Sequence, residues 1–134
     1  MSQNNPKVWE INGISLTLDL EDADVMERYE NAFDAMASEE KQIPKDGRRS
    51  AVYRAYCNLY RNLFDRLFGE GTADKVFAGQ PTSAAVYEAA YASFLDFARA
   101  QTAAAAERRN AMLLKYQPNR AQKRAAIKHS SKKR

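Results

Sequence analysis

Apolar and polar residues alternate near the start of the chain, over residues 7–20. The runs Val8–Ile11 and Ile14–Leu20 place β-branched or apolar residues at every second position. Asn12-Gly13 separates the two runs and favours a two-residue turn, because both central positions of that turn need positive φ. The pattern therefore predicts a β-hairpin.

After the hairpin the apolar spacing changes to three and four residues, which is typical of helices with one buried face. A first helix is expected from about Glu21, capped by Asp19, and it should end before Pro44. A second helix is expected over Arg49–Phe68 and should stop at the glycines that follow. The residues expected on the apolar faces are Val25, Tyr29, Ala32, Phe33 and Met36 in the first helix, and Val52, Tyr53, Tyr56, Cys57, Tyr60, Leu63, Phe64, Leu67 and Phe68 in the second.

The rest of the chain predicts a short helical turn at 72–77 and a last helix from about Thr82 or Ser83. The apolar face of this last helix reaches Ala98. Residues 101–109 then have high helix propensity but few side chains large enough to be buried. We therefore expect the same helix to continue out of the folded domain until Pro118 breaks it.

These elements predict an α+β fold that is mainly α. An N-terminal β-hairpin packs on about three helices, and a long final helix leads into a basic flexible tail. The expected division is a flexible N-terminus over 1–6, a folded domain over 7–106, and a basic C-terminal helical extension and tail over 107–134. The chain of 134 residues is long enough for one core.

Charge is distributed unevenly along the chain, whose net charge is +4. Residues 1–106 contain eleven Lys or Arg and sixteen Asp or Glu, a net charge of −5. Residues 107–134 contain ten Lys or Arg and one Glu, a net charge of +9. A basic end of this kind is usually solvated, and it can also bind phosphate backbones or steer the approach of an acidic partner.

Residues that could carry chemistry are few. The single histidine, His129, lies in the basic end, and the single cysteine, Cys57, lies in an apolar helical stretch where a buried, inert thiol is expected. Gly69-Glu70-Gly71 lacks the further glycines of a phosphate-binding loop, and the carboxylates of residues 21–24 suit the positive end of a helix dipole. We therefore expect no catalytic residues, no cofactor and no metal site.

Two groups of residues are candidates for binding other proteins. The hairpin could self-associate through its edge, with Trp9 partly exposed, or it could simply dock on the helices. The small apolar cluster before Pro118 could enter the groove of a partner, with the basic residues steering the encounter. The candidates are Trp9, Ile11, Ile14 and Leu16 for self-association, and Met112, Leu113, Leu114, Tyr116, Arg120, Lys123 and Arg124 for partner binding.

The N-terminus lacks the basic-then-apolar pattern of a signal peptide, and no apolar run approaches the roughly 18 residues needed to cross a bilayer. We therefore expect a cytosolic protein without a membrane partner.

Eight stretches of the sequence carry a resemblance: Trp9–Ile14, Leu18–Ala23, Arg28–Phe33, Ile43–Gly47, Tyr56-Cys57, Asn62–Asp65, Leu67–Ala73 and Tyr116–Arg124. Together they resemble an uncharacterised family of small proteins from tailed phages and prophages of Gram-positive bacteria. That family is similar to the tail assembly chaperones of long-tailed phages.

The resemblance implies a helical protein of the host cytoplasm that binds the tape measure protein and keeps it soluble. Such a protein would recruit subunits of the major tail protein, form homo-oligomers, and leave before the virion is complete. The alternative is a nucleic-acid-binding phage accessory protein that acts through its basic tail, with binding that weakens steeply as salt rises. A small phage enzyme is the third reading.

Overall fold

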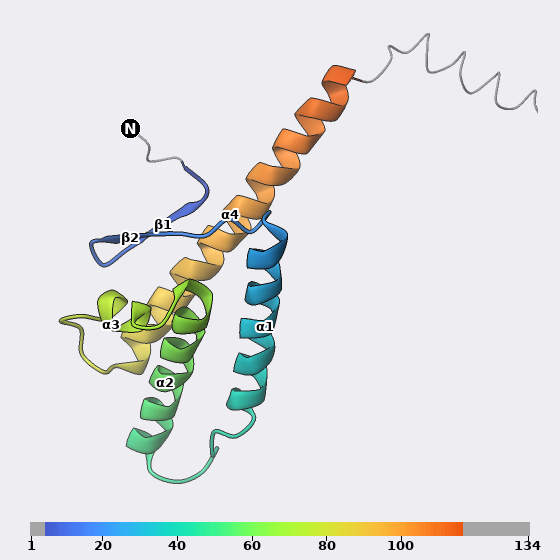
Figure 1. Ribbon diagram of the computed structural model, residues 1–134. Coiled ribbons are helices and arrows are strands. Elements are labelled where there is room, and N and C mark those ends of the chain that lie inside the picture. The colour runs from blue at the N-terminus through green and yellow to red at the C-terminus, as the bar shows by residue number, and fades with distance from the viewer. Residues whose placement is uncertain (1–4, 117–134) are drawn as a thin grey trace, which may run out of the picture. The chain divides into compact units, whose positions relative to one another are not determined.

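The computed structural model describes residues 5–116, which form a two-stranded antiparallel hairpin and four helices (Figure 1). The elements are β1 (Val8–Ile11), β2 (Ile14–Thr17), α1 (Ala23–Glu40), α2 (Arg49–Phe68), α3 (Thr72–Val76) and α4 (Ala84–Tyr116). The predicted mainly helical α+β fold, with its N-terminal hairpin and long final helix, is confirmed. The expected tail lies outside the described residues.

The chain divides into two compact units after Thr102. The first unit contains the hairpin, α1, α2, α3 and the part of α4 that ends at Thr102, while the second begins at Ala103. The sequence alone places this boundary between residues 106 and 107. The first unit contains all eighteen residues of the hydrophobic core, and the second contains the exposed end of α4.

The turn of the hairpin adopts the conformation that its sequence predicts. Asn12 has a φ of 50° and Gly13 a φ of 83°, as a two-residue turn of this type requires. The Asn12 side chain also donates a hydrogen bond of 2.7 Å from Nδ2 to the backbone oxygen of Val76. The residue that shapes the turn therefore also fastens it to the end of α3.

Trp9 lies in the centre of the core, which corrects the expectation that it is partly exposed. Its side chain is only 3% exposed, and its ring packs against four phenylalanines, at positions 64, 68, 94 and 97. Its Nε1 donates a hydrogen bond of 3.0 Å to Oγ of Ser93. The alternation along β1 turns Trp9 toward the helices, and burying so large an aromatic surface outweighs leaving it at an edge.

Helix α1 begins two residues later than expected and has a different cap. Oδ1 of Asp22 accepts hydrogen bonds from the backbone N–H groups of Asp24 and Val25, at 2.9 and 3.2 Å. The carboxylate of Asp19 instead accepts from the N–H of Glu21, at 3.1 Å. Asp22 is therefore the capping residue, because only its oxygen reaches two of the N–H groups that the first turn leaves unpaired.

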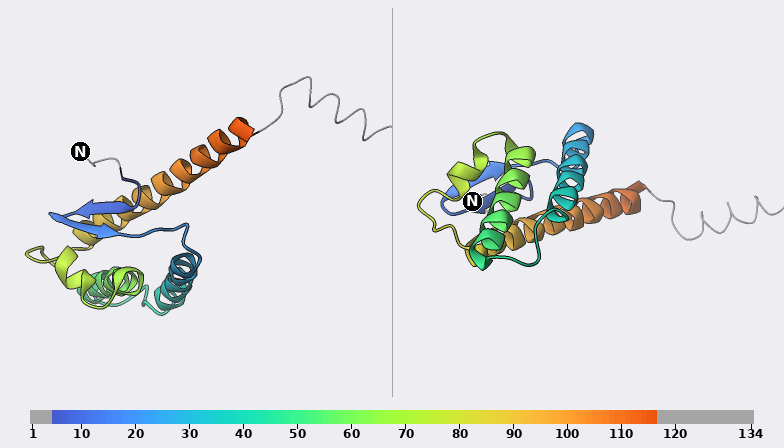
Figure 2. Two further views of the ribbon diagram at one scale, coloured as in Figure 1. Left: turned by 45° about the horizontal axis from the view of Figure 1, so that its top comes forward. Right: turned by 90° about the horizontal axis from the view of Figure 1, so that it is seen from below.

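Helices α1 and α2 lie side by side, and in the left view of Figure 2 they are seen nearly end-on with the hairpin above them. Helix α2 has the predicted bounds, and Cys57 is buried as expected. Tyr53 departs from the prediction, since it is 48% exposed. It is the fifth residue of α2, near the end of the helix that follows the loop from α1. The buried residues of the hydrophobic core are Trp9, Leu18, Leu20, Ala32, Met36, Cys57, Leu59, Tyr60, Leu63, Phe64, Leu67, Ala73, Val76, Phe77, Tyr87, Ala90, Phe94 and Ala98.

A buried glutamine joins α4 to the segments that flank the hairpin. Oε1 of Gln101 accepts a hydrogen bond of 2.5 Å from the N–H of Leu20. Its Nε2 donates to the backbone oxygens of Pro6, at 2.9 Å, and Leu18, at 2.8 Å. Gln101 is only 3% exposed, so its amide satisfies polar groups that water would reach poorly. One side chain therefore fixes both ends of the hairpin to the last helix.

Candidate functional site

The largest exposed apolar side chains of the described residues gather in the last two turns of α4. Met112 is 52% exposed, Leu113 55%, Leu114 71% and Tyr116 75%. Apart from Tyr53, no other large apolar side chain among residues 5–116 reaches this class of exposure. These four residues, here called the apolar end of α4, are the candidate site, because clustered exposed apolar side chains mark binding surfaces.

The local sequence explains why this segment is a helix although it buries so little. Residues 103–106 are four alanines, the residue with the highest helix propensity, and Lys115 in the last turn suits the negative end of the helix dipole. The Lys115 ammonium also lies 5.7 Å from the centre of the Tyr116 ring. The helix thus presents its apolar end without support from a large buried face.

Basic side chains surround the apolar end of α4. Between residues 107 and 116 the helix carries Arg108, Arg109 and Lys115 against one carboxylate, Glu107. All of these residues are exposed. The other residues expected to bind a partner, Arg120, Lys123 and Arg124, lie outside the described residues. A partner for this surface needs an apolar groove and acidic groups near it.

The hairpin residues expected to self-associate are turned inward. Trp9 pairs with Leu16 and Ile11 with Ile14, so all four side chains lie on one face of the hairpin. Trp9 is buried, and the other three are half-buried and pack against the core. Their side chains stabilise the fold, and self-association through the hairpin stays a prediction that rests on the backbone groups of its edges.

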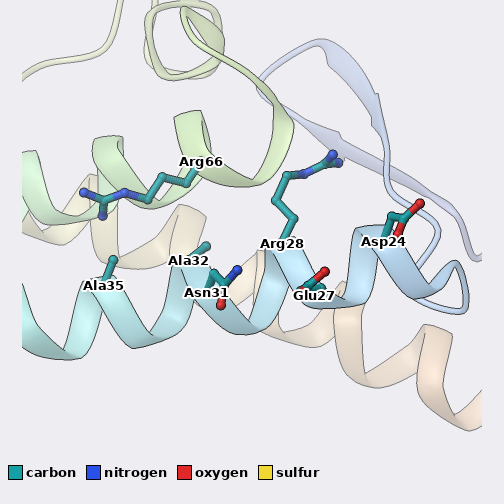
Figure 3. A pocket seen from close by; sticks show the side chains of 7 residues that line it. All are labelled: Asp24, Glu27, Arg28, Asn31, Ala32, Ala35 and Arg66. Carbon is teal, nitrogen blue, oxygen red and sulfur yellow. The ribbon is translucent and has the colours of Figure 1, made fainter.

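A groove of about 460 Å³ lies between α1 and α2, which sequence reasoning did not find (Figure 3). Ala32 and Ala35 lie along it, and Arg28 of α1 and Arg66 of α2 extend in opposite directions. The Nε of Arg28 donates to the backbone oxygen of Leu67, at 3.1 Å. The groove is lined by Asp24, Glu27, Arg28, Asn31, Ala32, Ala35 and Arg66.

Arg66 forms a two-bond ion pair with Glu39 across the two helices. Its Nη1 and Nη2 donate to Oε1 and Oε2 of Glu39, at 3.0 and 2.5 Å. These hydrogen bonds, more than the charge of Arg66 alone, hold the pKa of Glu39 below its ordinary value. The pair therefore links the last turn of α1 to the last turn of α2.

The Glu39–Arg66 pair predicts a pH dependence of stability. Because the pKa of Glu39 is lower in the folded protein, its contribution is present above the ordinary carboxyl pKa and disappears as pH falls through the lowered value. Both side chains are about a third exposed, so the contribution should stay below about 1 kcal/mol. At neutral pH, Glu39→Gln should have a free energy of unfolding lower than that of the wild type by this amount. On acidification its free energy of unfolding should change less than that of the wild type. Urea unfolding at several pH values measures both differences. An unchanged pH profile would contradict this assignment.

Burial favours the neutral forms of two side chains in the core, Cys57 and Tyr60. Burial raises the pKa of the Cys57 thiol, and burial followed by the charge of Glu88 raises the pKa of Tyr60 to about 12. Within residues 5–116, no group of three or more His, Cys, Asp or Glu side chains lies together where it could hold a metal ion. No helix in this range is long and apolar enough to cross a membrane.

Comparison with known families places most of the chain in one family. The model of a protein family matches residues 12–127. The chain belongs to DUF6673, a family of unknown function. No curated protein and no solved structure matches it.

The DUF6673 match extends from the turn of the hairpin past the end of α4. It includes the groove between α1 and α2, Gln101 and the apolar end of α4. It also includes the three basic positions expected to bind a partner, Arg120, Lys123 and Arg124. The two candidate surfaces therefore both lie within the family's own region of the chain.

Proposed function

We propose that this DUF6673 protein is a tail assembly chaperone of tailed phages. It binds the tape measure protein, keeps it soluble, and recruits subunits of the major tail protein. It works by binding and not by catalysis, in the cytoplasm of the bacterial host, and it is absent from the mature virion. The proposal rests on the sequence resemblance and on one structural observation, the exposed apolar end of α4.

The chemistry of this surface fits a long helical partner. Met112, Leu113 and Tyr116 point within about 100° of one another around the helix, since each residue turns by 100°. An amphipathic partner helix can bury such a face, and the basic side chains next to the apolar end of α4 attract acidic groups on the partner. Binding would remove large apolar side chains from water, at about 25 cal/mol for each Å² buried.

Co-expression with the tape measure protein of the same phage genome tests the proposal. The expected result is a soluble complex that contains several copies of this chain per tape measure chain, measured by size exclusion with light scattering. A tape measure protein that stays insoluble, while this chain elutes alone, would refute the proposal.

The apolar end of α4 should be needed for this capture. Changing Met112, Leu113, Leu114 and Tyr116 to serine should reduce the co-purified tape measure protein by at least about tenfold, a loss of 1.4 kcal/mol or more in binding. The stability of the protein should change little, because the four side chains are exposed. Tyr53→Ser is the matched control, since Tyr53 is also exposed but lies on α2. Equal capture by the two variants would contradict the assignment.

The rival function is nucleic-acid binding through the basic end. Residues 117–134 contain seven Lys or Arg and no acidic residue, which favours phosphate contacts. This function predicts DNA or RNA binding that weakens steeply with salt and does not depend on Met112–Tyr116. Electrophoretic mobility shifts of the wild type and of the serine variant, at low and physiological salt, distinguish the two functions.

A further inference from the structure

Helix α1 presents a strongly acidic outer surface. Between residues 21 and 34 the chain has six carboxylates and one base, Arg28, and all seven side chains are exposed. Asp24, Glu27, Asn31 and Asp34 follow one another at spacings of three and four residues, so they lie along one side of the helix. Asp24, Glu27 and Asn31 also line the groove between α1 and α2. This side of α1, here called the acidic face, therefore combines negative charge with a hollow.

The positive groups beside the acidic face already have partners. Arg66 donates two hydrogen bonds to Glu39, and the Nε of Arg28 donates a hydrogen bond to the backbone oxygen of Leu67. By contrast, no ion pair within residues 5–116 engages the three carboxylates of the acidic face, Asp24, Glu27 and Asp34. The acidic face thus keeps several carboxylates that a positively charged partner could neutralise.

The same chain contains a segment of matching charge. Residues 117–134 carry seven Lys or Arg and no Asp or Glu over eighteen residues. A segment of that length can extend over as much as about 60 Å, whereas the eighteen residues of α1 rise about 27 Å. The segment is therefore long enough to follow the whole acidic face.

We propose that the basic segment 117–134 of one copy binds the acidic face of α1, and the groove beside it, on a second copy. The two surfaces are different, so each bound copy still offers one free acidic face and one free basic segment. Such a head-to-tail contact can repeat from copy to copy. The proposal does not rest on the chaperone function, because it follows from charge and geometry within this chain alone.

The strength of the contact should depend on salt and on protein concentration. Ion pairs between exposed side chains are individually weak, so several must form together. Ions screen them over about 10 Å at 0.1 M salt and over shorter distances at higher salt. The association should therefore be reversible, should grow with concentration, and should disappear at high salt.

Light scattering of the purified, nucleic-acid-free protein tests the proposal. At low salt the average mass of the wild type should rise with concentration above the 15.2 kDa of one chain, and at high salt it should return to that value. Glu27→Lys/Asp34→Lys, which reverses two charges of the acidic face, should stay monomeric. Asp46→Lys/Glu70→Lys is the matched control, because both residues are exposed, lie outside α1, and change the net charge by the same amount. It should associate like the wild type.

A mixing experiment identifies the occupant. A second variant has glutamine at all seven basic positions of residues 117–134, and it should also be monomeric alone. An equal mixture of this variant with Glu27→Lys/Asp34→Lys combines one intact acidic face with one intact basic segment, so it should form complexes of two chains and nothing larger. A mixture that stays monomeric, a wild type that is monomeric at every concentration, or a control that also loses association would overturn the proposal.

Discussion

Replacing Trp9 by alanine is expected to lower the free energy of unfolding by about 3–5 kcal/mol, the range for removing a large aromatic residue from a packed core. That loss is a large fraction of the roughly 5–15 kcal/mol typical of a domain. The expected cause is the contact of the Trp9 ring with four phenylalanines from α2 and α4. Urea unfolding followed by circular dichroism measures the change.

Two milder variants separate packing from hydrogen bonding at this position. Ser93→Ala removes only the acceptor of the indole N–H and should cost about 1–3 kcal/mol, the penalty for one unpaired buried donor. Trp9→Phe keeps most of the aromatic contact and should cost less than Trp9→Ala. A loss below about 1 kcal/mol for Trp9→Ala would contradict the central position of this side chain in the core.

Replacing Gln101 by alanine is the second large effect, with an expected loss of about 2–5 kcal/mol. The variant leaves the N–H of Leu20 and the oxygen of Leu18 without their partner in a buried region. Each such group costs about 1–3 kcal/mol when water cannot replace the lost hydrogen bond. Urea unfolding should show the loss, and hydrogen exchange at the amide of Leu20 should accelerate.

Thr102→Ala is the control for Gln101. Thr102 is the next residue of α4, it is exposed, and its hydroxyl bonds only to the backbone oxygen of Ala98, at 3.1 Å. Its replacement should change stability by less than about 0.5 kcal/mol. If Gln101→Ala lowered the free energy of unfolding as little as Thr102→Ala does, water would be able to replace the Gln101 amide. That result would contradict the role of Gln101 in holding the hairpin to α4.

The parts of the fold that depend on neighbouring residues could be predicted from the sequence. Asn12-Gly13 fixed the hairpin turn, because few other pairs adopt positive φ twice in succession. The bounds of α2 followed from its apolar spacing and the glycine after Phe68. The predicted cap of α1, Asp19, was wrong, because Asp19 and Asp22 both precede the helix and only the folded backbone decides which oxygen reaches two N–H groups.

Contacts between distant residues were beyond the sequence. Trp9 and Ser93 are 84 positions apart, and Gln101 bonds to residues 81 to 95 positions away. When its partners are unknown, a tryptophan in a short strand is predicted to be exposed. A glutamine in an alanine-rich helix is likewise predicted to lie on the surface. Both side chains are buried instead, because the hairpin packs against α4.

Of the two candidate surfaces, one could be predicted from the sequence and the other could not. The exposure of Leu113 and Leu114 could be expected, because the alanines before them offer no wide apolar face to extend a core. The groove between α1 and α2 could not, because it needs Arg66 of one helix beside Ala32 and Ala35 of the other. Only the acidity of α1 was visible, and the sequence gives it another explanation as favourable charge at a helix start.

Site-specific photo-crosslinking in cells that express both proteins tests whether the apolar end of α4 captures the tape measure protein. A photoreactive amino acid replaces Leu114, the most exposed aliphatic residue of that end, and in a separate strain it replaces Tyr53. We expect an adduct with the tape measure protein from position 114 and none from position 53. Adducts from position 53 alone, or none with the tape measure protein from either position, would contradict this expectation.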